Sequence, residues 1–383
     1  MSNSRRNFIK KSLLFSATLP VLGSSFIACK NKPEKKNLSI LILGGTSFLG
    51  PHQIKYALER GHKVSIFTRG KTKPNVNRAV FDKVEHLVGD RENNLSALEN
   101  RKWDIVIDNS GQKASWTKAT ANLLKENCDL YVYTSSTGVY FPYKTGNIKE
   151  DQELLYKEPE NITDENLKLE YWYGVMKANS EQETINAFGK ERSIIVRPTY
   201  MFGPGDKTDR FIHWPIRLAK GGEILVPVKA DDPVQYIDVR DVAEFMIRLA
   251  EQKATGTYNA VGPLKKETIF DFVTNAKKAF STDASIVQID DYDFLKEHKI
   301  YYLVPWIPID EYTYGSARVN NDFSIKKGLT FRDLKASIKE THDWWYSDNL
   351  TDERRDKFEK KKDSILMQEK EIINAWKSVK KKV

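Results

Sequence analysis

Cysteine is scarce in this sequence, and histidine shows no pattern typical of a metal site. The 383 residues include two cysteines, Cys29 and Cys128, and we expect no disulfide if Cys29 carries a lipid. Cys128 lies just before an apolar stretch, which favours a small buried residue over a nucleophile. The six histidines have no metal-ligand spacing, so we predict no metal. No internal repeat or long low-complexity block stands out.

The folded part of the chain also lacks excess basic charge. Of the net charge of +9, residues 1–36 contribute +7 and residues 351–383 contribute +4, which leaves −2 for the rest. A nucleic-acid-binding protein should concentrate basic charge on its fold. We therefore predict that the protein does not bind nucleic acid. With 40% hydrophobic residues, the chain can bury one large or two modest cores.

Residues 38–58 have the order of a strand, a tight glycine turn and a helix. Gly44 permits the turn, Gly50 lets the helix pack close to the strand, and Pro51 suits a first helical turn. Free backbone N–H groups and the helix dipole at such a turn attract phosphate. The predicted phosphate-binding residues are Gly44, Gly45, Thr46, Ser47, Phe48, Leu49 and Gly50.

A second group of residues suits proton transfer. Residues 130–133 read as a buried strand that delivers Ser136 at its C-terminal end, where an open parallel sheet binds ligands. Residues 170–185 read as a helix, which places Tyr173 and Lys177 one turn apart on one face. A nearby ammonium lowers the pKa of a phenol, and a serine hydroxyl can hold a substrate oxygen.

The spacing Tyr-x-x-x-Lys occurs three times, and each pair alone could be structural. Tyr140/Lys144 contains Pro142, so the two side chains share no helical face. Tyr292/Lys296 follows no serine-bearing strand and favours a solvated surface pair. The Tyr173/Lys177 pair has both a glycine turn and a serine strand upstream, which favours catalysis there.

These features, from about Leu38 to Trp345, resemble the extended branch of the short-chain dehydrogenase/reductase superfamily, the NAD-dependent epimerase/dehydratase-like proteins. The segments 197–206, 236–243 and 258–262 are similar to later landmarks of that branch. The resemblance implies an α/β fold, namely a Rossmann-type doubly wound parallel sheet. It also implies a smaller C-terminal substrate-binding region and a C-terminal helical tail.

Carried over, the resemblance implies the catalytic set Ser136, Tyr173 and Lys177, with Lys177 also binding the cofactor ribose. Asp90 matches the residue that contacts adenine, and we expect Asn109 and Ser110 to lie along the cofactor. The implied substrate is a sugar or a sugar-derived hydroxyl or carbonyl compound, which is reduced or epimerised. A homodimer is common in this superfamily.

Two departures from the family pattern bear on this function. Ser47 stands in place of the middle glycine, as in atypical members, some of which have lost catalysis. Arg69 follows the second strand where an acidic residue would bind the ribose, which favours NADP over NAD, although a solvated loop residue is the alternative. A non-catalytic NAD(P)-binding sensor or scaffold is therefore the second hypothesis.

The excursion after the sixth strand is expected to reach the substrate. Chain order places residues 206–228 over the C-terminal edge of the sheet. The aromatic side chains there could equally anchor a lid to the core. The predicted substrate-binding residues are Arg210, His213, Trp214 and Gln235, with Glu170 and Trp172 as further candidates.

The N-terminus is similar to a signal for the twin-arginine export route. Arg5 and Arg6 precede a mildly apolar stretch, Leu13 to Ala28, which is too short and broken for a membrane span. Residues 26–29 resemble a lipoprotein cleavage box, so we predict lipidation at Cys29, with chance occurrence as the alternative. These features indicate a periplasmic protein that is anchored to the membrane.

We expect four parts of the chain. Residues 1–36 form the signal and tether, and residues 37–200, with a return segment at about 229–262, form the NAD(P)-binding domain. Residues 201–228 and 263–350 form the substrate-binding region. Residues 351–383 read as one amphipathic helix that packs on the body, with a membrane-surface role as the alternative.

Overall fold

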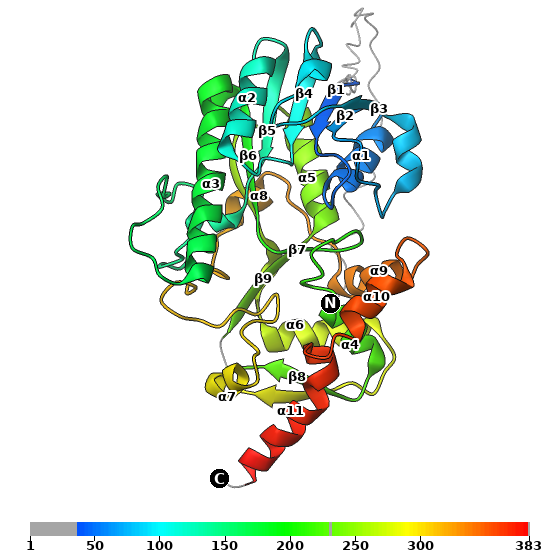
Figure 1. Ribbon diagram of the computed structural model, residues 1–383, viewed down its shortest axis with the longest axis vertical. Coiled ribbons are helices and arrows are strands. Elements are labelled where there is room, and N and C mark those ends of the chain that lie inside the picture. Colours follow the sequence, from blue (N-terminus) through cyan, green and yellow to red (C-terminus); the bar gives the residue numbers. More distant parts are fainter. Residues whose placement is uncertain (1–36, 230–231, 382–383) are drawn as a thin grey trace, which may run out of the picture. The chain divides into compact units, whose positions relative to one another are not determined.

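The computed structural model describes residues 37–229 and 232–381, which belong to one compact unit, Asn37–Val383. The predicted signal and Cys29 lie outside the described residues. Within them, a parallel seven-stranded sheet has the order β10-β6-β5-β4-β1-β2-β3 (Figure 1). Its strands are β1 (Ser39–Leu43), β2 (Lys63–Thr68), β3 (Glu85–Val88), β4 (Trp103–Asp108), β5 (Cys128–Thr134), β6 (Ser193–Pro198) and β10 (Gly256–Ala260). This is the predicted doubly wound α/β fold.

Helices cover both faces of this sheet. Two of them, α1 (Gly50–Glu59) and α5 (Val239–Glu251), pack against one another, and α2 (Ala114–Leu124) packs against α3 (Glu165–Phe188). The central strands are buried on both sides and read as continuous apolar runs, as in Ile40, Leu41 and Ile42, which are fully buried, whereas the edge strand β3 is largely exposed. We call this part the first lobe.

The second lobe follows the C-terminal ends of these strands and is built around two small sheets. One contains β7 (Met201–Phe202), β9 (Pro233–Asp238) and β11 (Gly262–Thr268), and the other pairs β8 (Glu223–Pro227) with β12 (Ser285–Ile289). Its helices are α4 (His213–Lys220), α6 (Ile269–Ala276), α7 (Tyr292–Glu297) and α9 (Leu334–Trp345), and α8 (Asp322–Lys326) packs on β10. Aromatic side chains dominate its core, among them Trp214, Phe272 and Trp306.

The return segment divides between the two lobes. Strand β9 pairs with β7 and β11 in the second lobe, whereas α5 and β10 belong to the first. The chain crosses at Asp238, whose carboxylate accepts the Arg240 N–H and begins α5. The predicted boundary at about residue 229 therefore falls nine residues before the crossing, because strand β9 pairs in the second lobe first.

The tail forms two helices rather than the single predicted one, namely α10 (Asp352–Glu359) and α11 (Ile365–Lys380). Phe358 on α10 packs against Trp345, whereas Ile372 and Trp376 on α11 enter the second-lobe core. One straight helix could not direct both groups to their partners. The tail therefore packs on the body, and no helix among the described residues is long and apolar enough to cross a bilayer.

Candidate active site

The glycine turn before α1 has the geometry that binds a phosphate. Gly44 has a φ of +81°, and a Cβ on Gly50 would collide with the Gly45 carbonyl. No side chain of a described residue caps the start of α1, and its first turn holds no acidic residue. The backbone N–H groups at this helix start therefore suit an anion.

The residues that follow β2 and β3 lie at the same edge of the sheet. Arg69 is exposed just after β2. Asp90 follows β3, where its carboxylate accepts the Glu92 N–H at 2.8 Å and its backbone pairs with Asn94. Arg69 is therefore exposed at this edge, whereas Asp90 is half-buried.

Lys177 is fixed beneath the C-terminal end of β5. The residue is 8% exposed, and its ammonium donates to the Thr134 carbonyl at 3.0 Å and lies 5.1 Å from the centre of the Tyr133 ring. Burial acts to lower the pKa of Lys177, but the nearby phenols of Tyr133 and Tyr173 outweigh it and raise that pKa. Lys177 is therefore held as a cation close to Tyr173.

Ser136 and Tyr173 meet at Gly138. Ser136 begins the short 3-10 helix Thr137–Tyr140, where its Oγ accepts the Gly138 N–H at 3.0 Å. A Cβ on Gly138 would lie 2.8 Å from Cε1 of Tyr173 and 3.3 Å from Oγ of Ser136. Gly174 lets α3 approach closely, since its own Cβ would lie 2.5 Å from the Gly138 carbonyl. The structure thus brings Ser136, Tyr173 and Lys177 together.

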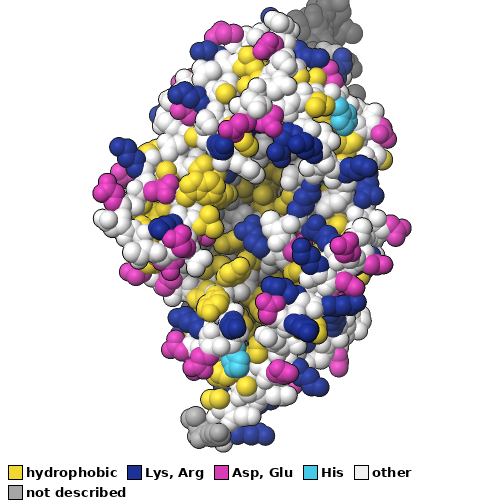
Figure 2. Space-filling model, viewed as in Figure 1, with side chains coloured by type: hydrophobic (Ala, Val, Ile, Leu, Met, Phe, Trp, Pro, Cys, Tyr) yellow, Lys and Arg dark blue, Asp and Glu magenta, His cyan; other side chains and the backbone are white. Residues whose placement is uncertain are grey.

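A cavity of about 400 Å³ is lined by Ser136 and Tyr173, whereas Lys177 is buried and does not line it. Both lobes contribute to its walls, and the face drawn in Figure 2 is hollowed between them, with hydrophobic side chains around the hollow. Glu170, Trp172 and Arg210 line the cavity, as the sequence predicts. Burial raises the pKa of the Glu170 carboxyl, while Arg210 opposes this shift. The cavity therefore combines an aromatic surface with groups that accept and donate hydrogen bonds.

Comparison with known proteins identifies the family. The model of the NAD dependent epimerase/dehydratase family matches residues 40–261, which are more than half of the chain. The chain belongs to the NAD-dependent epimerase/dehydratase family. Its matched region includes the glycine turn, Ser136, Tyr173 and Lys177.

The curated relatives that match this chain share 30% of its residues or fewer over the matched region. The chain is 30% identical over 271 residues to the chloroplast stem-loop binding protein of 41 kDa b of Arabidopsis thaliana, which covers 66% of this chain and 65% of that protein. The match also covers 60% of a putative dihydroflavonol 4-reductase of Synechocystis sp., at 25% identity, and 52% of a sterol-4-alpha-carboxylate 3-dehydrogenase of Candida albicans, at 28% identity. The chain therefore spans about half to two thirds of the length of these curated relatives.

Solved structures of epimerase-type enzymes share the fold. The enzyme WbmG of Bordetella bronchiseptica, in complex with NAD and UDP, is 17% identical with a TM-score of 0.57, covering 84% of this chain and 98% of that chain. The UDP-N-acetylglucosamine 4-epimerase of Methanobrevibacter ruminantium M1, in complex with UDP-N-acetylmuramic acid, is also 17% identical. Its TM-score is 0.60, and the match covers 81% of this chain and 98% of that chain.

Three predicted substrate residues do not line this cavity. The Trp214 side chain is fully buried, and its indole N–H donates to the Val304 carbonyl at 2.8 Å. His213 is buried beside it, and the Gln235 amide bonds both backbone groups of Val319, at 2.8 and 3.0 Å. These predictions were wrong because α4 and β9 turn these side chains toward the second lobe and residue 319. Trp214 instead anchors the segment to the core, which was the alternative interpretation of its aromatic side chains.

Asn109 and Ser110 have partners within the protein. The Asn109 amide donates to Gln53 at 2.6 Å and accepts from Thr134 at 2.7 Å. The Ser110 hydroxyl accepts from Arg91 at 2.9 Å. The two side chains therefore fix the loop after β4 beside the glycine turn, where a Cβ on Gly44 would lie 2.7 Å from the Ser110 Cβ.

Sequence reasoning missed two buried ion pairs behind the site. Arg91 makes a two-pronged contact with Asp108 at 2.7 and 2.9 Å, and Tyr131 donates to the same carboxylate. Burial alone would raise the pKa of Asp108, but Arg91 holds that pKa below its usual range. The sequence did offer one signal for this pair, because Asp108 ends an apolar strand and a buried carboxylate needs a partner of opposite charge.

The second pair is Arg197–Glu181, with contacts of 2.9 and 2.6 Å. Ser135 donates to Glu181, and Arg197 also donates to the Tyr140 hydroxyl at 2.7 Å. All four side chains are at most 5% exposed. This network ties α3 to β5 and β6 directly behind the cavity.

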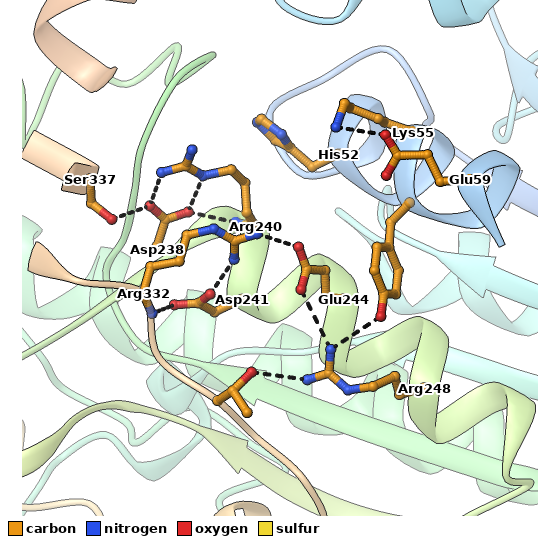
Figure 3. Close-up of polar contacts among 12 residues, drawn as sticks. His52, Lys55, Glu59, Asp238, Arg240, Asp241, Glu244, Arg248, Arg332 and Ser337 are labelled. Carbon is orange, nitrogen blue, oxygen red and sulfur yellow. Dashed lines mark hydrogen bonds and ion pairs between the residues drawn. The ribbon is translucent and has the colours of Figure 1, made fainter. Parts of the chain in front are cut away.

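A second polar cavity, of about 230 Å³, lies beside α1 (Figure 3). Arg240 is paired with Asp238 and Glu340, and Arg332 with Asp241 and Glu244. Because these charges already have partners, the cavity offers no unneutralised group to a ligand. The network instead holds residues 332–340 against α5.

Proposed function

We propose that this protein is an NAD(P)-dependent oxidoreductase or epimerase that acts on a sugar or a related hydroxyl or carbonyl compound. The observation that carries the proposal is that Ser136 and Tyr173 line one cavity together with Phe48 of the glycine turn. Lys177 is buried close to Tyr173, where its charge acts on the phenol. Family membership and the sugar-nucleotide complexes of structurally similar enzymes support it.

The residues present fit a dinucleotide. The turn at residues 44–50 supplies backbone N–H groups with no acidic residue in the first turn of α1, and Phe48 of that turn lines the cavity. The positions of Arg69 and Asp90 suit the adenosine ribose and the adenine. Arg69 favours NADP, because a guanidinium can pair with a 2′-phosphate. When bound, the nicotinamide supplies the acceptor and donor of two electrons.

The residues of this chain bind the substrate oxygen and transfer its proton. Ser136 accepts a backbone N–H at its Oγ, so its own hydroxyl hydrogen is left to bond the substrate oxygen. The Tyr173 phenolate takes the hydroxyl proton as the substrate carbon is oxidised, and the phenol returns it on reduction. Lys177 stabilises the phenolate by its charge. An epimerase would use both directions within one turnover.

The cavity wall suits a polyhydroxylated substrate. Trp172 is 45% exposed and offers an apolar face, while Glu170 and Arg210 can accept and donate hydrogen bonds to hydroxyl groups. The relative from Arabidopsis thaliana is named for stem-loop binding, but the charge of −2 over residues 37–350 favours a small molecule for this chain.

We further propose export by the twin-arginine route and lipidation of Cys29, based on the sequence at residues 4–29. Fractionation of cells that express the wild type and Cys29→Ala tests this. Wild type in the membrane fraction and the variant in the soluble periplasmic fraction would support anchoring. An identical distribution of the two would contradict it.

The catalytic role of Tyr173 is tested by Tyr173→Phe, with Tyr292→Phe in α7 as the matched control. Any cofactor is first identified by denaturing the purified protein and analysing the released small molecules. Turnover is then followed over a panel of sugars and sugar nucleotides. We expect Tyr173→Phe to lose roughly 10²- to 10⁴-fold in kcat with nearly unchanged cofactor affinity. Equal activity of both variants, or a wild type that binds no dinucleotide, would contradict the proposal.

A further inference from the structure

Lys207 lies on the loop between β7 and α4 and reaches back to the glycine turn. Its ammonium donates to the Thr46 carbonyl at 3.2 Å, although 161 residues separate the two in the sequence. The side chain is half-buried. A residue of the second lobe therefore contacts the turn at which we place the cofactor phosphates.

The charge of Lys207 is not neutralised by the protein. Among the described residues, no carboxylate lies within 4 Å of its ammonium, and a neutral carbonyl is its hydrogen-bond partner. Burial, and secondarily the nearby Arg354, lowers the pKa of Lys207. A half-buried ammonium that faces a phosphate-type turn and lacks an acidic partner favours an anionic ligand.

The loop that carries Lys207 is held from two sides. On one side, Nε2 of His52 in α1 donates to the Pro204 carbonyl at 2.8 Å (Figure 3 shows His52). On the other side, Arg354 of α10 donates to the Asp206 carbonyl at 3.2 Å and to the Asp209 carboxylate at 2.6 Å. Because both ends are fixed, Lys207 is positioned in advance rather than recruited.

We propose that Lys207 is a cofactor-binding residue whose ammonium pairs with the pyrophosphate of the dinucleotide at the glycine turn. Arg354 is the positioning residue that holds its loop. This inference rests on the proposed dinucleotide function. It adds a cation from the second lobe to a turn that otherwise offers backbone N–H groups, and it gives a role to α10, which lies beyond the region of the family match.

The test measures dinucleotide affinity by isothermal titration calorimetry, using the full chain. The variants are Lys207→Ala, Lys207→Arg and the control Lys118→Ala, which removes an exposed lysine from α2. NAD, NADP and ADP-ribose are the ligands, because all three contain the pyrophosphate. We expect about 10- to 100-fold weaker binding of all three to Lys207→Ala, partial recovery in Lys207→Arg and no change in Lys118→Ala.

Two further measurements separate binding from folding. The melting temperature of the ligand-free Lys207→Ala protein should stay close to that of the wild type, because the lost bond joins a lysine to a carbonyl. The affinity of wild type should fall more steeply with salt than that of the variant. Arg354→Gln should weaken binding less than Lys207→Ala does, with the same factor for NAD and ADP-ribose.

The outcomes distinguish the two proposals. If wild type binds a dinucleotide and Lys207→Ala binds it within about twofold of Lys118→Ala, the pyrophosphate-binding role of Lys207 is overturned and the proposed function stands. If Lys207→Ala weakens the binding of a UDP-sugar but not of ADP-ribose, the ammonium serves the substrate phosphates, and the pyrophosphate-binding role is again overturned. If wild type binds none of the three ligands, both proposals fail.

Discussion

Ser135 and Ser136 are neighbours at the end of β5, yet they face opposite environments. Ser135 is 3% exposed and donates to the Glu181 carboxylate, inside a network in which each of its members has a partner. Ser136 is half-buried and lines the cavity, and its hydroxyl donates to no side chain or carbonyl of the described residues. The alternation of side chains along an extended segment separates them.

The comparison extends to the residues around each serine. Behind the strand, Arg197 and Glu181 neutralise one another, and Arg197 also donates to the Tyr140 hydroxyl, which makes this side a rigid support. In front of it, Glu170 and Arg210 reach the cavity without a mutual ion pair among the described residues. Polar groups whose hydrogen-bonding and ionic partners lie within the protein hold the geometry of the site, and polar groups without such partners remain available to a ligand.

The largest effect should come from the support side. Arg197→Met leaves the buried Glu181 carboxylate without its partner, and we expect a loss of about 3–5 kcal/mol in the free energy of unfolding. Urea denaturation measures it. Arg210→Met, at the exposed cavity side, is the matched control and should change stability by less than about 0.5 kcal/mol. Equal losses in both variants would remove the distinction between the two sides.

Replacing each serine by alanine should affect different properties, namely stability for Ser135 and kcat for Ser136. Ser135→Ala should cost about 1–3 kcal/mol of stability because Glu181 loses a hydrogen bond. Ser136→Ala should cost about 1 kcal/mol or less, from the lost contact to the Gly138 N–H, but roughly 10²-fold in kcat. Urea denaturation and steady-state kinetics on both variants provide the measurement. The comparison breaks if Ser135→Ala has the larger effect on kcat.

The smallest effect concerns stability at acid pH. It compares the paired buried groups behind β5 with a buried histidine of the second lobe that has no such partner in the described part of the chain. His213 is buried there, and its Nε2 has no hydrogen-bond partner among the described residues. Burial, aided by the charges of Arg217 and Lys220, lowers the pKa of His213 to about 3. Its contribution to stability is therefore complete above the unfolded pKa of about 6.5 and is lost as the pH falls toward 3.

We expect wild type to lose up to about 1.4 kcal/mol per pH unit relative to His213→Phe in this window. Unfolding free energies measured between neutral pH and pH about 4.5 test the slope. A constant difference between wild type and His213→Phe across the window would show that His213 is not held neutral.

Much of the first lobe was predictable because its signals are local. Residues 38–43, 104–108 and 194–196 are apolar runs that became β1, β4 and β6, and the glycine turn lies where its residue types require it. The long-range network was not predictable, because Glu181 and Arg197 are 16 residues apart on different elements and only packing makes them partners. The tail was predicted as one helix because the spacing of its apolar residues does not reveal against which part of the protein each segment packs.

The sequence by itself determined the strand–turn–helix at Gly44 to Gly50 and the placement of Tyr173 one turn before Lys177. Backbone sterics and the helical repeat act over a few residues and need no partner from elsewhere in the chain. Only the tertiary structure decided that Trp214 turns into the core, that Ser136 meets Tyr173 across Gly138, and that Lys207 reaches Thr46. Those contacts join residues far apart in the chain, and the packing of the two lobes selects them.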